Sequence, residues 1–244
     1  MKVDLHLHTT CSDGLFTPQQ LVKKAYELNL KAIAITDHDT VDGILPAIIE
    51  ANKYKDLEVI PGIELSTHCN GQEVHILGYY IDYENFHLKE QLLDLQQNRI
   101  KRLEKILTKL NDIDIQIKYD DVYKYSRGTS VGRPHVALAL VEKGYVSSIK
   151  EAFDKFLAKG RPAYVPRKKL TPIDAIKLIK ECRGIPVLAH PGLLEDDSII
   201  SELITNGIMG IEVIHKDHTK DDTAYYTKLA LENNLLLTGG SDSH

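Results

Sequence analysis

Two histidines near the start of the chain, His6 and His8, are spaced to project side by side from a β-strand. Val3, Leu5 and Leu7 alternate with the polar residues around them, which is the period of a strand with one apolar face. Side chains two residues apart on a strand point to the same face. Two protonated imidazoles so placed repel each other, and a divalent cation between them removes the repulsion. The pair indicates a metal site, and a half-exposed strand that merely carries two histidines is the alternative.

The same association of a strand-like run with metal-capable side chains recurs along the chain. Six apolar or β-branched runs carry such residues, and in five of them the residues follow the carboxyl end of the run. A random scatter of the 11 histidines would not produce this recurrence. We therefore predict a site that holds more than one metal ion.

The candidate ligands combine six imidazoles with three carboxylates. They are His6, His8, Asp13, His38, Glu64, His75, His190, Asp242 and His244. This mixture suits Zn²⁺, Mn²⁺ or Fe²⁺ better than Ca²⁺, which takes oxygen ligands. Nine protein groups are too many for one ion and fit two or three divalent ions, with Glu64 able to bridge. A purely structural cluster is the less favoured alternative, because structural zinc sites are usually closed cages rich in cysteine.

Composition places the chain among ordinary globular enzymes. Its 244 residues are enough for one large domain, or for one domain with an insert. No apolar run follows a basic N-terminal segment, and none approaches the ~18 apolar residues of a spanning helix, so we expect neither a signal peptide nor membrane association. The three cysteines, Cys11, Cys69 and Cys182, show no pairing pattern. Free thiols suit a reducing compartment, so we expect a cytoplasmic protein.

Strand-like and helix-like runs alternate in the first and last thirds of the chain, which predicts βαβ units and a parallel sheet. Thr17 and Pro18 open the first helix with a capping box, Asp42 is expected to cap the second, and Thr171 opens a later one. Seven strands are expected, near residues 3, 32, 59, 74, 186, 211 and 236. A β/α barrel collects its working residues at the carboxyl ends of its strands, as here. The alternative, an open doubly wound sheet, would draw its site from one switch point.

The alternation stops at about residue 83 and helical patterns replace it. Leucines at helical spacing predict one long amphipathic helix between about residues 88 and 110. Shorter helices are expected to begin at Pro134 and at Ser147 or Ser148. We predict a small helical domain, residues 83–165, inserted into the barrel between its first part, residues 1–82, and its second part, residues 166–244.

The charge of the chain is unevenly spread between these parts. Residues 83–165 contain 15 Lys and Arg against 11 Asp and Glu, whereas the remainder contains 15 against 24. An acidic body that holds metal cations, beside a mildly basic insert, suits an anionic substrate. The excess is too small to indicate nucleic-acid binding by itself.

Five motifs in this chain resemble those of the PHP (polymerase and histidinol phosphatase) metal-dependent phosphoesterases. In order they are His6-x-His8, Thr36-Asp37-His38, Gly62-Ile63-Glu64, Ala189-His190-Pro191 and Gly240-Ser241-Asp242-x-His244. The resemblance covers the whole chain and implies a distorted seven-stranded β/α barrel. It is strongest to the branch with an inserted segment, which includes nucleoside 3′,5′-bisphosphate phosphatases and 5′-to-3′ exoribonucleases. Members of this branch usually continue beyond the last motif, so we expect a further C-terminal segment.

The resemblance also implies how the ligands divide among three metals. One metal would be held by His6, His8, Glu64 and Asp242, a second by Glu64, His75 and His190, and a third by Asp13, His38 and His244. Catalytic roles would fall to Glu64, Asp13, His190 and Asp242. Asp37 is expected to orient His38 or to cap a turn, and His215 and His218 are left outside the ligand set.

A second set of candidates lies in the predicted insert, at Gly132-Arg133-Pro134-His135. Backbone N–H groups at a helix N-terminus together with an arginine make a phosphate pocket. In the bisphosphate phosphatases a comparable arginine and histidine bind the second phosphate of the substrate, so the resemblance implies that role for Arg133 and His135. Plain helix-start chemistry is the alternative. Lys159 and Arg161 are weaker candidates of the same kind.

The resemblance implies an enzyme that hydrolyses a phosphate monoester of a small nucleotide, by an attacking hydroxide that the metals activate. The substrate would be a nucleoside 3′,5′-bisphosphate. The alternatives are a 5′-to-3′ exonuclease on short RNA, a phosphatase like histidinol phosphatase, and a non-catalytic metal-bound module that binds nucleotide. We expect a small phosphorylated substrate and no obligate protein partner.

Overall fold

The structure is a computed structural model that describes residues 2–125, 131–166 and 170–244. The chain divides into two compact units: residues 1–90 with 169–244 form the first, and residues 91–168 form the second. The second unit starts and ends a few residues later than the predicted insert. The division of the chain into those domains stays a prediction.

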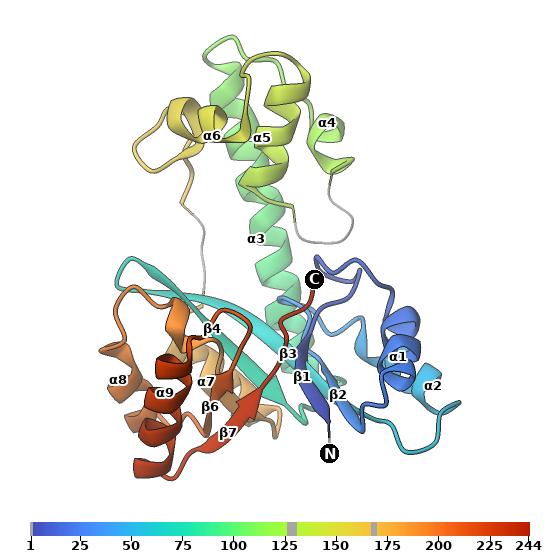
Figure 1. The fold of residues 1–244 in the computed structure, drawn as a ribbon. Coiled ribbons are helices and arrows are strands. Elements are labelled where there is room, and N and C mark those ends of the chain that lie inside the picture. Colours follow the sequence, from blue (N-terminus) through green and yellow to red (C-terminus); the bar gives the residue numbers. More distant parts are fainter. Residues whose placement is uncertain (1, 126–130, 167–169) are drawn as a thin grey trace. The chain divides into compact units, whose positions relative to one another are not determined.

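The first unit is built on seven strands that form a nearly closed barrel (Figure 1). The strands are β1 (Val3–Leu7), β2 (Ala32–Ile35), β3 (Glu58–Cys69), β4 (Gln72–Tyr79), β5 (Ile185–Leu188), β6 (Gly210–Ile214) and β7 (Leu236–Gly239). Each pairs with the next in chain order. The residues after β7 return to the first strand, where the His8 N–H donates to the Ser243 carbonyl over 3.1 Å. The predicted seven-stranded β/α barrel is confirmed.

Two pairings in the barrel are antiparallel. The parallel arrangement predicted for the first third holds for β1, β2 and β3, but β4 runs against both of its neighbours, β3 and β5. The long strands β3 and β4 form a hairpin, so metal-capable residues on them lie within the strands rather than at their ends. This explains why Glu64 is followed by five more strand residues, ending at Cys69.

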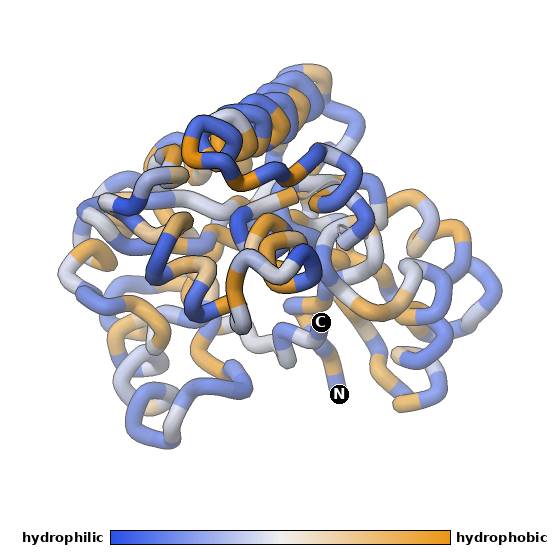
Figure 2. The backbone as a smooth tube through the Cα atoms, turned by 90° about the horizontal axis from the view of Figure 1, so that it is seen from above, coloured by the Kyte–Doolittle hydropathy of each residue, from blue (hydrophilic) through white to orange (hydrophobic). Residues whose placement is uncertain are grey.

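Helices flank the strands of the first unit (Figure 1). They are α1 (Pro18–Glu27), α2 (Ile44–Ala51), α7 (Pro172–Glu181), α8 (Ile199–Thr205) and α9 (Lys220–Glu232), with a 3₁₀ turn η2 (Pro191–Leu193). Hydrophobic and hydrophilic segments alternate along the chain, as amphipathic helices require (Figure 2). Apolar residues of these helices such as Val22, Ile44 and Leu203 are buried, as are strand residues such as Ile33 and Ile63.

Of the three helix starts predicted in the first unit, two are correct and one is wrong. Thr17 forms the expected capping box with Gln20, and Thr171 caps α7. Asp42 does not cap α2, which begins after Gly43 and has no side-chain cap. Gly43 occupies the N-cap position instead, where the chain comes so close to the site that a Cβ would lie 2.3 Å from Oδ2 of Asp37.

The second unit is helical and has its own core. Most of α3 (Phe86–Asn111) belongs to it, with α4 (Tyr119–Tyr123), α5 (Arg133–Glu142), α6 (Ile149–Ala152) and a π-helical turn η1 (Phe153–Leu157). Its core contains leucines from three of these elements, Leu103, Leu110, Leu140 and Leu157, all nearly or fully buried. Of the helices described, none is both long enough and apolar enough to cross a membrane.

Leu77 provides a test of the barrel core. It is fully buried on β4 and packs in the core cluster with Ala34 and Val187. Leu77→Ala should lower the free energy of unfolding by about 2–5 kcal/mol, because the cavity adds to the lost transfer energy. Leu45 on α2 is 48% exposed, so Leu45→Ala should change it by no more than ~0.5 kcal/mol. Equal effects of the two changes in urea unfolding would contradict this packing.

Candidate metal centre

Glu64 lies at the centre of the clustered histidines. Its carboxylate is almost completely buried, and Oε1 lies 2.8 Å from Nδ1 of His75 and 3.1 Å from Nε2 of His190. The other oxygen, Oε2, faces His6 Nε2 at 3.2 Å, His8 Nε2 at 3.3 Å and His38 Nδ1 at 3.1 Å. One carboxylate therefore contacts five imidazoles, with a different set on each oxygen.

The metal-capable atoms form three overlapping groups. The first group is His6, His8, Glu64 and Asp242; the second is His38, Glu64 and His75; the third is His8, Asp13, His38 and His244. Within each group the ligand atoms lie within 4.8 Å of one another. Ligands bound to one ion at about 2.0–2.2 Å would lie within roughly 4.4 Å of each other. Small side-chain movements would therefore suffice to bring each group onto a common ion.

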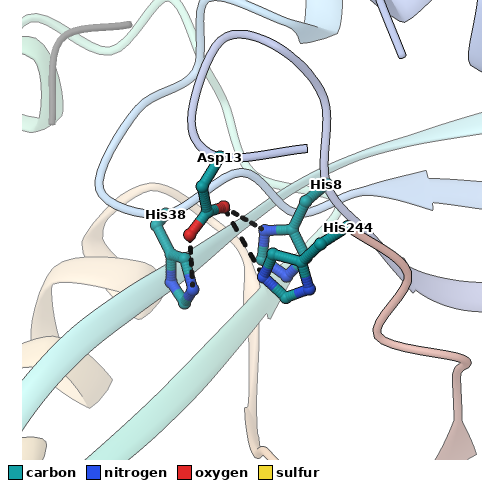
Figure 3. A group of neighbouring side chains, drawn as sticks. All are labelled: His8, Asp13, His38 and His244. Atoms are coloured by element: carbon teal, nitrogen blue, oxygen red, sulfur yellow. Dashed lines mark ion pairs between the residues drawn. The ribbon is translucent and has the colours of Figure 1, made fainter. Parts of the chain in front are cut away.

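The third group draws its members from distant parts of the chain (Figure 3). Asp13, in the loop after β1, points toward the three imidazoles: its oxygens lie 3.7 Å from His8 Nδ1, 3.9 Å from His38 Nε2 and 3.5 Å from His244 Nε2. The Asp13 side chain is 52% exposed and that of His244 is 37% exposed. This group is therefore the part of the site that solvent reaches most easily.

All nine predicted ligands converge on one site, but they do not group as the resemblance implied. The first group is the same as predicted. In the second, His38 takes the place that was given to His190, although His190 also contacts Glu64. The third group adds His8 to the three residues expected. Which residue binds which ion stays a prediction.

Opposite charges perturb the pKa values of these groups strongly. Burial alone would lower the pKa of His8 and His75, but neighbouring carboxylates outweigh it, Asp242 and Glu64 for His8 and Glu64 for His75, and raise both to about 9. The pKa of His6 is likewise raised well above its usual value against the effect of burial. His38 is the exception, because burial and the nearby cationic imidazoles lower its pKa to about 4.

The carboxylates respond in the opposite direction. Burial alone would raise the pKa of Glu64, but the surrounding imidazoles, His38 and His6 first, hold it well below its usual range. Asp242 is similar: burial would raise its pKa, but hydrogen bonds from His215 and His8 overcome burial and lower it. Both carboxylates are thus kept ionised, which is the state that binds a cation.

These properties fit divalent metal ions. The site combines ionised carboxylates with protonated imidazoles. A bound cation would replace the protons of these imidazoles and neutralise the same carboxylate charge. Nδ1 of His8 and of His38 are buried and make no hydrogen bond within the described residues, as expected of nitrogens available for coordination. The donor set contains only nitrogen and oxygen, as Zn²⁺, Mn²⁺ or Fe²⁺ accept.

Of the two roles expected for Asp37, its contacts fit that of a turn cap rather than that of orienting His38. Its carboxylate accepts hydrogen bonds from the Thr9 N–H at 2.7 Å, the Thr9 hydroxyl at 2.7 Å and the Ser12 hydroxyl at 2.6 Å. The acceptor atoms are thus directed at the loop after β1, which carries Asp13, rather than at His38. Asp37 fixes this loop against the strand end of β2.

Three residues that lie at the site were not among the predicted ones. Glu212 contacts His6, Nε2 of His215 lies 3.3 Å from Oδ2 of Asp242, and the Lys216 ammonium donates to the Asp242 carbonyl over 2.6 Å. Glu212 carried one signal in the sequence, because it is the only charged residue in the run Gly210-Ile211-Glu212-Val213-Ile214. His215 carried another signal, because it directly follows that strand-like run, although it was left outside the predicted ligand set. The sequence showed no signal that would separate Lys216 from a surface loop.

The predicted substrate-binding residues all belong to the second unit. Arg133 begins α5, its guanidinium lies 5.5 Å from the Phe153 ring centre and 5.8 Å from that of Tyr164, and its Nη1 donates to the Leu157 carbonyl. Nδ1 of His135 accepts the Gly132 N–H, which is helix-start chemistry. Burial lowers the pKa of His135. Lys159 and Arg161 are exposed.

Comparison with known proteins gives the class of the protein. Residues 4–183 match the PHP domain. The chain is 34% identical over 247 residues to the 5′-3′ exoribonuclease Rnm of Escherichia coli, covering 99% of this chain and 84% of that protein. It is 30% identical over 248 residues to the 3′,5′-nucleoside bisphosphate phosphatase of Chromobacterium violaceum, covering 99% and 87%. The chain belongs to the PHP domain family.

A solved structure agrees with this assignment. A candidate metal-dependent phosphoesterase from Bifidobacterium adolescentis superposes with a TM-score of 0.82 at 31% identity, over 100% of this chain and 88% of that one. Together with the clustered histidines and carboxylates, the family membership makes this protein an enzyme, a metal-dependent phosphoesterase.

The pKa shifts predict how the stability of the metal-free protein, prepared with a chelator, depends on pH. His8 and His75 have pKa values raised from 6.5 to about 9, so the folded chain holds these protons more tightly than the unfolded chain. Their contribution to stability is complete below pH 6.5 and is lost as pH rises through about 9. His38, whose pKa is lowered to about 4, acts in the opposite direction but only below pH 6.5.

The melting temperature in EDTA should therefore fall between pH 6.5 and 9, and His8→Gln should reduce the fall. A melting temperature that rises over this interval would show that the imidazoles are not held as cations by Glu64 and Asp242.

Proposed function

We propose that this phosphoesterase removes one phosphate from a small nucleotide, a nucleoside 3′,5′-bisphosphate, and that the nine clustered side chains hold two or three ions of Mn²⁺, Fe²⁺ or Zn²⁺. The observation that carries the proposal is the contact of both Glu64 oxygens with histidines of overlapping groups. Such bound ions would lower the pKa of water and neutralise charge that develops on the phosphoryl oxygens.

Glu64 is suited to a bridging position. Oε1 faces His75 and His190, whereas Oε2 faces His6, His8 and His38. The two oxygens would each bind a different ion, and the buried backbone of β3 fixes the carboxylate between them. His6, His8 and Asp242 would complete the coordination on one side.

The exposed third group would receive the phosphate. Asp13 and His244 are the most solvent-accessible of the ligand candidates, so a phosphate ester reaches the site on this side. Lys216, 48% exposed and bonded to Asp242, adds a cation close to the same cluster. Asp37 would support the reaction indirectly by holding the loop that carries Asp13.

The substrate class rests on Arg133. The rings of Phe153 and Tyr164 hold its guanidinium in place, and within the described residues the Leu157 carbonyl takes only one of its five N–H donors. The other donors, at the N-terminus of a ten-residue helix, suit an anionic phosphate group. The C. violaceum relative, by its name, acts on a substrate with two phosphates, which supports the same role for Arg133 here.

A second candidate function is 5′-to-3′ exonuclease activity on short RNA, favoured by the name of the E. coli relative. Both activities would use the same ligands and differ only in the leaving group. Long nucleic acids need an extended basic surface, and the small positive excess of residues 83–165 argues for short substrates. Phosphate release from nucleotides, compared with mononucleotide release from short 5′-phosphorylated RNA in the presence of Mn²⁺, separates the two.

Glu64→Gln tests the metal chemistry. A neutral amide cannot replace a carboxylate that bridges two ions, so bound metal should fall and phosphate release should drop by orders of magnitude. Metal content by mass spectrometry and turnover should both be measured. Glu58→Gln is a matched control, because Glu58 lies on the same strand but is exposed, and among the described contacts its side chain accepts a hydrogen bond only from the Tyr80 hydroxyl. Full metal content with near-normal turnover in Glu64→Gln would remove Glu64 from the mechanism.

Arg133→Ala tests the substrate class. Charge-assisted hydrogen bonds contribute about 1.5–3 kcal/mol each, and each ~1.36 kcal/mol is a tenfold change in rate. The change should lower kcat/KM for a 3′,5′-bisphosphate about tenfold to a hundredfold. Hydrolysis of p-nitrophenyl phosphate should change little, since that substrate has no second phosphate.

Arg133→Lys should recover only part of the loss, because an ammonium lacks the planar fork of a guanidinium. Lys150→Ala, at an exposed residue of α6, serves as the charge control in the same unit. Equal losses on both substrates would assign Arg133 to folding of the second unit, through its contacts with Phe153 and Tyr164. No loss on either substrate would leave it a helix-start residue.

A further inference from the structure

Glu212 is a buried carboxylate that the proposed reaction does not use directly. It lies in the middle of β6 and is completely shielded from solvent. A buried ionised carboxylate is costly unless it is paired and hydrogen-bonded. The groups that contact Glu212 therefore indicate its role.

The first partner is the ring of His6. Nδ1 of His6 lies 3.1 Å from Oε1 of Glu212 and 3.2 Å from Oε2. On the opposite side of the same ring, Nε2 faces Glu64 and Asp242 at 3.2 Å and 3.4 Å. A carboxylate on Nδ1 keeps the proton on that nitrogen, so Nε2 is left to bind a cation.

The second partner is the backbone of His190. Its N–H donates to Oε2 of Glu212 over 2.9 Å. His190 has φ 24° and ψ 60°, a left-handed conformation that is unfavourable for a residue other than glycine. This hydrogen bond stabilises the turn after β5, and the turn places Nε2 of His190 against Oε1 of Glu64.

The two partners face different oxygens of Glu64. His6 meets Oε2 and His190 meets Oε1, and both are fixed by the single side chain of Glu212. Removal of Glu212 would therefore loosen ligands on both sides of the proposed bridge at once.

We propose that Glu212 is the positioning residue of this metal centre, which aims the ring of His6 through Nδ1 and holds the strained backbone of His190. The inference rests on the proposed function, because it needs His6 and His190 to be metal ligands. It assigns Glu212 no contact with substrate or metal.

The test is the affinity of the metal-free protein for Mn²⁺, measured by calorimetric titration, with bound metal counted by mass spectrometry. Loss of a carboxylate that orients a ligand typically weakens metal binding by about 10–100-fold, and Glu212→Ala should show a loss of that size. Glu212→Gln keeps one oxygen that can accept from both partners but loses the charge, so its affinity should be intermediate. Excess Mn²⁺ should restore much of the turnover of both variants.

Tyr79→Phe is the matched control for a purely structural effect. Tyr79 is buried on β4, which is not paired with β6, and its hydroxyl donates to the Leu5 carbonyl of β1. The change should lower the melting temperature and leave Mn²⁺ affinity unchanged. If Glu212→Ala fails to fold, Glu212→Gln decides the question.

Each remaining outcome has a distinct meaning. Folded Glu212 variants with the affinity of the unchanged protein would overturn the inference alone. Equal weakening by Tyr79→Phe would also overturn it, by assigning the effect to the packing of the barrel. Failure of the unchanged protein to bind Mn²⁺, Zn²⁺ or Fe²⁺ would overturn the proposed function, and the inference with it.

Discussion

The burial of Glu64 is the constraint on which the rest of this site depends. A carboxylate shielded from water is tolerated only when nearby positive charge and hydrogen bonds replace its hydration. Five imidazoles, from the ends of β1, β2 and β5 and from within β1 and β4, supply that replacement here. The protons of these imidazoles, or the cations that would displace them, therefore balance the charge of Glu64 in the barrel interior. The fold depends on that positive charge.

The antiparallel hairpin of β3 and β4 makes this arrangement possible. Parallel neighbours present ligands only where their carboxyl ends meet, at one edge of the barrel. In the hairpin Ser66 pairs with His75 and Glu64 pairs with Leu77, so a carboxylate and an imidazole from adjacent strands lie two residues apart in register. Glu64 thus reaches the middle of the cluster and the ligands at the strand ends surround it.

The parts of this structure that sequence reasoning predicted are those with a local signal. Alternating apolar residues mark β1, and motifs of three to five residues mark most of the ligands, so seven strands and nine converging side chains could be expected. Contacts between distant residues carry no such signal. Glu212 is 206 positions from His6, and Asp37 bonds Thr9 and Ser12 from another strand end. Asp42 has the residue type of a helix cap, but the helix begins after Gly43. The close approach of Gly43 to Asp37 is a contact between distant residues that one sequence does not reveal.

The two compact units separate the metal-ligand candidates from the substrate-binding candidates. All nine metal-ligand candidates, together with Glu212, belong to residues 1–90 and 169–244, whereas Arg133, His135, Lys159 and Arg161 belong to residues 91–168. Five of the ligand candidates contact Glu64, so a change at Glu64 disturbs several of them at once. Arg133 depends on Phe153, Tyr164 and Leu157, which lie outside that cluster. Under the proposed function, substitutions in the second unit would alter which phosphate ester is bound and would leave the contacts around Glu64 intact.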